Sequence, residues 1–268
     1  MLNLRRDQAP ISDAAWAEID AEAKRVLELT LAARRLVDFR GPLGWETDAV
    51  STGRVRPLSH EMPQSVQMKL RQPQPLAELR GNFSLSRAEL EDVDRGASDV
   101  ELQPLIDAAI EFARAEDHAV FNGSDVACIL GMGPASPHAA LTISEDYDQY
   151  PSTVAEATNV LRRAGVEGPF AIALGPRCYA GLMQASTGGY PVLDRVRNIL
   201  AGPVVWAPTI DGALVVSMRG GDYELTAGQD VSIGYCGHDE EQVHFFIAES
   251  FCFRVLSPEA TVALRYAS

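Results

Sequence analysis

The sequence of 268 residues predicts an α+β fold. Three observations support this class. Two long segments carry apolar residues at helical spacing, a middle segment alternates short helical and strand-like runs, and the residues after 222 consist mainly of strand-like runs. Apolar residues make up 46% of the chain, which is enough for a core and too many for a disordered protein.

The first long helix should begin at Ser12 or Asp13, both good N-cap residues, and run to about residue 35. Its apolar stripe comprises Trp16, Ile19, Ala23, Val26, Leu27 and Leu31. A second long helix is expected over 99–121, because apolar residues repeat there at helical spacing and Gly123 follows.

Residues 46–79, between these helices, suit an extended hairpin that projects from the body. Apolar and polar residues alternate weakly, and prolines at 57, 63, 73 and 75 interrupt the pattern. Such an arm exposes backbone hydrogen-bonding groups along its edges, which a neighbouring subunit could satisfy.

The residues from 124 to 152 are rich in Gly, Pro, Ser and Asp and should form loops. A compact α/β unit follows, with helices expected at 153–164, 177–185 and 190–200 and strands at 170–174, 204–206 and 214–218. Further strands are expected at 223–225, 231–235, 243–253 and 261–266. Glycines within 219–222 and 228–235 mark tight turns between these strands.

The chain is acidic, with 37 Asp and Glu against 23 Lys and Arg and a formal net charge of −14. Nucleic acid and membranes are not expected partners, because duplex DNA and anionic lipid would both be repelled. The surplus lies in two segments: residues 81–127 carry 11 acids and 3 bases, and residues 222–268 carry 8 acids and 2 bases. The arm at 46–80 is slightly basic, with 5 bases and 4 acids.

Cysteine use and the N-terminus indicate a cytoplasmic protein. The cysteines at 128, 178, 236 and 252 form no CxxC pair and suggest neither a metal knuckle nor a disulfide framework. The first ten residues lack the apolar core of a secretory signal, and no apolar run approaches the length of a membrane span.

Two clusters are candidates for chemistry. Glu241 and His244 have the spacing of a metal pair on a helix, but the residues that follow alternate like a strand, which would direct the two side chains to opposite faces. We therefore expect an ordinary half-exposed His244 and no metal site. Glu116, Asp117 and His118 are adjacent on the second helix, where neighbours do not face one another, so a solvated or interface-facing cluster is expected.

Motifs of common enzyme classes are missing from the sequence. It contains no GxSxG, Walker A or HExxH motif, and Gly131-Met132-Gly133 lacks the third glycine of a dinucleotide-binding fingerprint. The five histidines are scattered, and no Ser/His or Cys/His pair rises above chance.

A series of segments, in order along nearly the whole chain, resembles the type 1 encapsulins, bacterial shell proteins formerly grouped with the linocin-type bacteriocins. The segments are LRRDQAP at 4–10, WAEID at 16–20, GPLGWE at 41–46, FSL at 83–85, ELEDVDRG at 89–96, ED at 116–117 with FNG at 121–123, RGGD at 219–222, GQDVSIGY at 228–235 and ESFCF at 249–253. Each segment alone is a weak signal, but their order and coverage make the match specific.

This resemblance implies the fold of tailed-phage major capsid proteins, the Hong Kong 97 type. In that fold a peripheral domain holds a long spine helix, an extended loop reaches a neighbouring subunit, and an axial domain gathers at a fivefold axis. The corresponding parts are 1–45 (N-terminal helix and start of the peripheral domain), 46–80 (extended loop), 81–125 (peripheral domain with the spine helix), 126–221 (axial domain) and 222–268 (β-rich return to the peripheral domain).

The resemblance also implies a structural protein without a reaction of its own. Encapsulins self-assemble into icosahedral nanocompartments that enclose a cargo enzyme, often a ferritin-like iron oxidase or a dye-decolourising peroxidase, through a C-terminal targeting peptide. In the family this peptide docks between the N-terminal helix and strands of the peripheral domain. Carried over to this sequence, the docking residues are Arg34, Asp38, Asp230 and Ile233, with helix-end ion pairing or strand packing as their alternative roles.

By the same resemblance, a pore for small substrates would come from the loop around Leu182, Gly188, Gly189 and Tyr190, where no ring of charges predicts strong ion selectivity. Some relatives stack flavin on an aromatic residue, but the matching position here is Ala88, so no cofactor is expected.

Two alternatives remain open. A phage or prophage major capsid protein would share the fold, and a free-standing metal or redox enzyme would use Glu241, His244 and the cysteines. Bacteriocin or protease activity, once attributed to this family, finds no supporting nucleophile constellation in the sequence.

Overall fold

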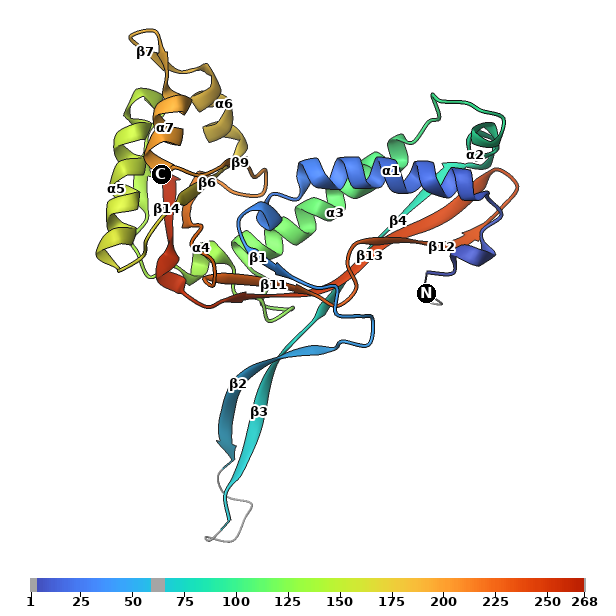
Figure 1. Cartoon of the computed structure of the whole chain (residues 1–268), viewed down its shortest axis with the longest axis horizontal. Helices are drawn as coiled ribbons and strands as arrows, with labels where there is room; N and C mark the ends of the chain where they lie inside the picture. Colours follow the sequence, from blue (N-terminus) through green and yellow to red (C-terminus); the bar gives the residue numbers. More distant parts are fainter. Residues whose placement is uncertain (1–3, 59–65, 268) are drawn as a thin grey trace.

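The computed structural model describes residues 4–58 and 66–267, which form an elongated body with one projecting arm (Figure 1). Two five-stranded sheets occupy different halves of the body. The helices α1 (Asp13–Thr30) and α3 (Gln103–Asn122) lie along the first sheet, and α5 (Tyr150–Arg163), α6 (Pro176–Gln184) and α7 (Val192–Leu200) surround the second. This arrangement is the α+β class that the sequence predicts.

The first sheet is organised around one long strand, β13 (Gln242–Val255). Its strand order is β1 (Asp38–Arg40), β11 (Tyr223–Ala227), β13 and β12 (Ser232–His238), and β4 (Ala77–Ser86) pairs with β13 outside this order. An aromatic cluster joins the sheet to α1: the Trp16 ring meets Phe245 edge-on with centroids 5.4 Å apart, and Phe83 stacks on Phe245 at 5.4 Å. The apolar stripe of α1 therefore covers one face of this sheet.

The second sheet has the order β5 (Leu141–Ile143), β14 (Thr261–Tyr266), β10 (Ala213–Ser217), β6 (Phe170–Leu174) and β9 (Val204–Trp206). Every residue of β6 and β10 is buried, as expected for central strands that are covered on both faces. Short elements connect these parts: α2 (Arg87–Asp94), α4 (Met132–Ala135), the hairpin of β7 (Ser186–Thr187) and β8 (Tyr190–Pro191), and the 3₁₀ turns η1 (Arg6–Gln8), η2 (Ala33–Arg35), η3 (Tyr147–Gln149) and η4 (Pro258–Ala260).

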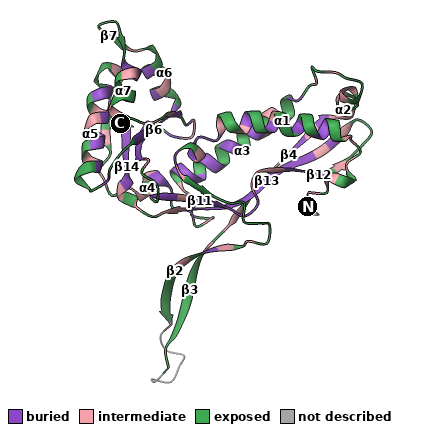
Figure 2. Ribbon diagram, in the orientation of Figure 1, coloured by how far each residue is buried: buried purple, intermediate pink, exposed green. Residues whose placement is uncertain are grey.

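The arm is the antiparallel pair β2 (Ala49–Leu58) and β3 (Met68–Pro75), as the sequence predicts. It projects away from both sheets, and most of its residues are exposed (Figure 2). The tip of the predicted hairpin lies outside the described residues. Within those residues, no helix combines the length and the apolar character needed to cross a membrane.

The structure departs from the sequence-based expectations in three places. The first helix ends at Thr30, short of the predicted residue 35, because the N–H groups of Ala32 and Ala33 bind the side chain of Asp117 and do not continue the helix. The predicted loop region 124–152 contains α4 and β5. Finally, η4 redirects the chain after β13, so that β14 pairs with β10 and β5 in the second sheet and does not return to the first.

Candidate functional site

A groove of about 610 Å³ runs between α1 and the segment that leads into β12. Its apolar lining consists of Leu4, Ala23, Leu27, Leu31, Val231 and Ile233, and its polar lining of Arg6, Asp20, Lys24, Glu28, Arg34, Arg35, Asp230 and Ser232. On the α1 side these positions repeat every three or four residues, which identifies one helical face beside the face that packs on the sheet. The groove therefore has apolar walls with charged groups among them.

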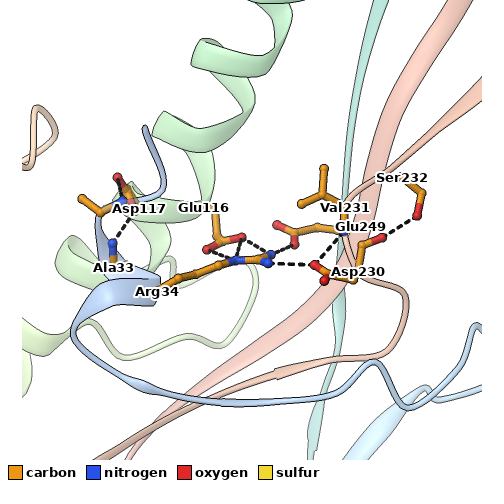
Figure 3. A network of polar contacts seen from close by, with 9 residues as sticks. Ala33, Arg34, Glu116, Asp117, Asp230, Val231, Ser232 and Glu249 are labelled. Carbon is orange, nitrogen blue, oxygen red and sulfur yellow. Dashed lines mark hydrogen bonds and ion pairs between the residues drawn. The ribbon is translucent and has the colours of Figure 1, made fainter. Parts of the chain in front are cut away.

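One end of the groove is formed by Arg34, which η2 presents directly after α1. Its guanidinium group donates from Nε to both oxygens of Glu116, at 2.9 and 3.0 Å, and from Nη2 to Oε2 of Glu116 at 2.6 Å. Nη2 also reaches Oε2 of Glu249 at 2.6 Å, and Nη1 reaches Oδ1 of Asp230 at 2.7 Å (Figure 3). One cation thus joins α3, β13 and the segment just before β12.

Burial dominates the electrostatics of this cluster. The side chains of Glu116 and Glu249 are fully buried, and that of Arg34 is 16% exposed. Burial opposes the charge of Arg34, but the hydrogen bond and charge of Glu116 and the charges of Glu249 and Asp230 outweigh it and raise its pKa above the usual value. Burial, followed by the nearby negative charge of Glu116, raises the pKa of Glu249 well above its ordinary value.

The neighbouring Asp117 holds the turn that carries Arg34. Its two carboxylate oxygens accept hydrogen bonds from the backbone N–H groups of Ala32, at 3.1 Å, and Ala33, at 2.8 Å (Figure 3). Burial raises the pKa of Asp117 to about 7, although both N–H donors act in the opposite direction.

The burial of Glu116 and Asp117 corrects the expectation of a solvated or interface-facing cluster. Both side chains are fully buried, whereas His118, the third residue of the predicted cluster, is exposed. A signal for this was present in the sequence, because Glu116 and Asp117 share the helical face of Phe112, Ala113 and Val120. The residues that donate hydrogen bonds to them lie 82 to 85 residues away along the chain, so local spacing did not reveal them.

Three of the four docking residues inferred from the resemblance line the groove, namely Arg34, Asp230 and Ile233. Asp38 does not, because it lies on β1 and its Oδ2 accepts a hydrogen bond from the backbone N–H of Gly221 at 2.6 Å. That contact supports the tight turn at Gly220 and Gly221, which have φ angles of 81° and 77°. Asp38 therefore stabilises a turn that lies outside the groove.

The inferred pore residues are divided between core and surface. Leu182 lies on α6 and is buried in the core of the second sheet, so it does not form part of an exposed rim. Gly188 and Gly189, with φ angles of 61° and 82°, form the turn between β7 and β8. Tyr190 directly after this turn is 51% exposed and Met183 on α6 is 57% exposed, so the exposed part of the predicted loop includes the hairpin and the end of α6.

The remaining candidates lie around the start of β13. His244 is a half-exposed residue of this strand, as predicted, with Nδ1 2.8 Å from Oγ of Ser84 and Nε2 3.4 Å from Oδ2 of Asp239. The described residues contain no group of three or more His, Cys, Asp or Glu side chains placed to hold a metal ion. Ala88, on α2, borders a separate hollow together with Arg87, Glu240 and Glu241.

Comparisons with known proteins agree over nearly the full length. A family described as encapsulating protein for peroxidase matches residues 1–252. The type 1 encapsulin shell protein of Rhodospirillum rubrum is 50% identical over 99% of this chain and 97% of its own length, and that of Brevibacterium linens is 44% identical over 98% and 99%. The corresponding protein of Mycobacterium tuberculosis is 42% identical over 99% and 100%.

Solved structures support the fold independently. The virus-like particle from Pyrococcus furiosus has a TM-score of 0.60 at 16% identity, covering 90% of this chain and 97% of its own. The capsid of Myoviridae phage XM1 has a TM-score of 0.56 at 11% identity, covering 89% and 92%. These likenesses confirm the predicted capsid fold of the Hong Kong 97 type, and together with the sequence relatives they show that the chain belongs to the encapsulin family of structural shell proteins.

Proposed function

We propose that this chain closes into an icosahedral compartment that encloses a cargo enzyme, and that a C-terminal peptide of the cargo docks in the groove between α1 and β12. Membership of a family of shell proteins supports the assembly. The docking proposal depends on the groove itself, in which apolar walls from two separate elements meet charged groups that could fix the register of a bound chain.

The dimensions of the groove suit a short extended peptide. Its α1 wall runs from Asp20 to Leu31, which at about 1.5 Å per residue corresponds to roughly 16 Å. About five residues of an extended chain cover this length at roughly 3.3 Å each. Leu27, Leu31, Val231 and Ile233 would receive apolar side chains on alternate residues of such a peptide.

The cargo class that fits best is an oxidative enzyme. The description of the matching family names a peroxidase as the enclosed protein. A ferritin-like iron oxidase is the second cargo class that the resemblance implies. Small substrates would enter through pores lined by the exposed hairpin at Gly188, Gly189 and Tyr190. A role as a phage or prophage capsid protein rests on the shared fold alone, because those structures are 16% identical or less.

Ile233→Asp tests the docking groove. Co-expressed with a dye-decolourising peroxidase that carries a C-terminal targeting peptide, the variant should form shells of normal size by negative-stain electron microscopy that contain no cargo, because a charge at this buried apolar position prevents apolar docking. Ile233→Val retains the apolar surface and should load normally.

Ile233 is buried, so Leu27→Asp on the opposite, more exposed wall provides a second variant. Normal amounts of cargo in shells of both variants would show that docking occurs elsewhere. A discrete small oligomer of the wild-type protein under native conditions would contradict the shell assignment itself.

A further inference from the structure

The cluster at the end of the groove has an imbalance of charge. A single guanidinium, that of Arg34, contacts the three carboxyl groups of Glu116, Glu249 and Asp230. If all three were ionised, the cluster would carry two uncompensated negative charges, and two of its carboxylates are fully buried. An uncompensated buried charge is strongly unfavourable, and such sites commonly take up a proton instead.

The geometry identifies which carboxyl group holds the proton. Glu116 accepts from Arg34 through both of its oxygens, the bidentate arrangement of an ionised carboxylate. Glu249 uses only Oε2 toward Arg34, while its Oε1 is buried and has no donor among the described residues. Glu249 and Glu116 also lie within hydrogen-bond reach of each other, and two carboxyl groups can share a hydrogen bond only if one of them is protonated.

Two other acids lie near the pair formed by Glu116 and Glu249. Asp230, just before β12, is half exposed at the groove and can be solvated there. Asp117 directs both oxygens to the backbone of η2 and not to the guanidinium of Arg34. The groups that bear on Glu249 are therefore Arg34 from η2, Glu116 from α3, and Asp230.

We propose that Glu249 carries a proton that it shares with Glu116, and that these two glutamates are positioning residues that hold Arg34 at the end of the groove, which makes peptide docking dependent on pH. This inference rests on the proposed docking function. Loss of the proton would place two buried carboxylates against each other with one cation between them, and the repulsion would loosen the wall formed by Arg34 and Asp230. Docking would therefore weaken as pH rises.

The test measures binding of a defined probe to assembled shells, a fluorescein-labelled peptide in which Leu alternates with Ser. In wild-type shells, affinity should fall by up to about tenfold per pH unit above the pKa of the pair, the limit for one coupled proton. Glu249→Gln retains an acceptor for Arg34 and offers an N–H group to Glu116 without titrating. Its affinity should therefore fall less steeply with rising pH than that of the wild type, and the slope that remains is that of Asp117 and the other titrating groups.

Glu28→Gln is the matched control, because Glu28 lines the same groove but is exposed on α1. It should keep the wild-type pH slope. A slope in Glu249→Gln equal to that of the wild type would overturn the proposal. If shells of Glu249→Gln do not form, Glu116→Gln removes the other member of the pair and should flatten the profile in the same way.

Infrared spectroscopy separates this inference from the docking function. The difference spectrum of wild-type minus Glu249→Gln shells at neutral pH should show the C=O stretch of a buried carboxylic acid, in which the contribution of the buried Asp117 cancels because both proteins contain it. The difference spectrum of wild-type minus Glu28→Gln shells should lack this band, and its absence from the first difference spectrum would overturn the shared proton. Failure of the peptide to bind at any pH would contradict the docking function and the proposed pH dependence of docking. The infrared band would still show whether Glu249 is protonated.

Discussion

At the scale of single residues, Asp117 connects the long helix α3 to the position of Arg34. Its carboxylate binds two successive backbone N–H groups of the turn after α1, and this turn fixes where the Arg34 side chain starts. The carboxylate is buried, and the pKa of about 7 exceeds the value of 3.8 for the free side chain. Between these two values the folded chain holds a proton that the unfolded chain has released, so stability falls as pH rises through this range.

The variant Asp117→Asn tests this linkage. Asn keeps one acceptor oxygen and cannot titrate, so the loss of stability with rising pH should be absent at this site. From about pH 5 to about pH 8, the wild type should lose about 3 kcal/mol relative to the variant, because two pH units lie between pH 5 and the folded pKa and each corresponds to about 1.4 kcal/mol. Melting temperatures of both proteins at the two pH values measure the difference, and a gap that is independent of pH would contradict it.

Residue patterns predicted contacts along one element and missed contacts between distant ones. The apolar face of α1 and the half-exposed position of His244 followed from spacing alone, because spacing reports which face of an element is buried. The docking residues inferred by resemblance include three that line the groove and one, Asp38, that supports a turn elsewhere. Glu116 and Glu249 were not identified as the partners of Arg34, because a buried ion pair depends on tertiary contacts that periodicity cannot show.

At the scale of elements, the arm cannot be stable by itself. A two-stranded hairpin that lacks a covering layer is at best marginal in water, and this one exposes Val55 by 50% and Leu70 by 49%. The strands project away from the body, so the chain's own sheets do not cover them (Figure 2). The missing cover is best supplied by a second copy of the chain, which agrees with membership of a shell-forming family.

Leu70→Ser should therefore impair assembly while leaving the subunit folded. Leu70 contributes to the apolar surface of the arm and not to either core, so its loss removes contact between copies. Mass photometry should show fewer closed shells and more small species, with an unchanged circular dichroism spectrum. Leu70→Met preserves apolar area and should assemble as the wild type does; equal assembly of Leu70→Ser would mean that this part of the arm remains uncovered.

At the scale of the whole molecule, charge is separated between the arm and the far end of the first sheet. Arg54, Arg56, Lys69 and Arg71 are all exposed on the arm, and none forms an ion pair with another described residue. The exposed acids Asp99, Glu101, Asp107 and Glu111 lie between α2 and the first half of α3, at the end of the body remote from the arm (Figure 1). These opposite charges lie too far apart to pair within one chain, but they could meet between copies.

Shell stability should consequently depend on salt. Raising the ionic strength from about 0.15 M to about 1 M shortens the screening length from about 8 Å to about 3 Å, which weakens attraction between exposed charges. Light scattering should then show faster release of subunits.

The double variant Arg56→Glu with Arg71→Glu should assemble poorly at low salt, and its subunit release should depend much less on salt. Arg56→Lys with Arg71→Lys conserves charge and should behave as the wild type. Subunit release that is the same at both salt concentrations would show that apolar contact, and not the separated charge, holds the arm on its neighbour.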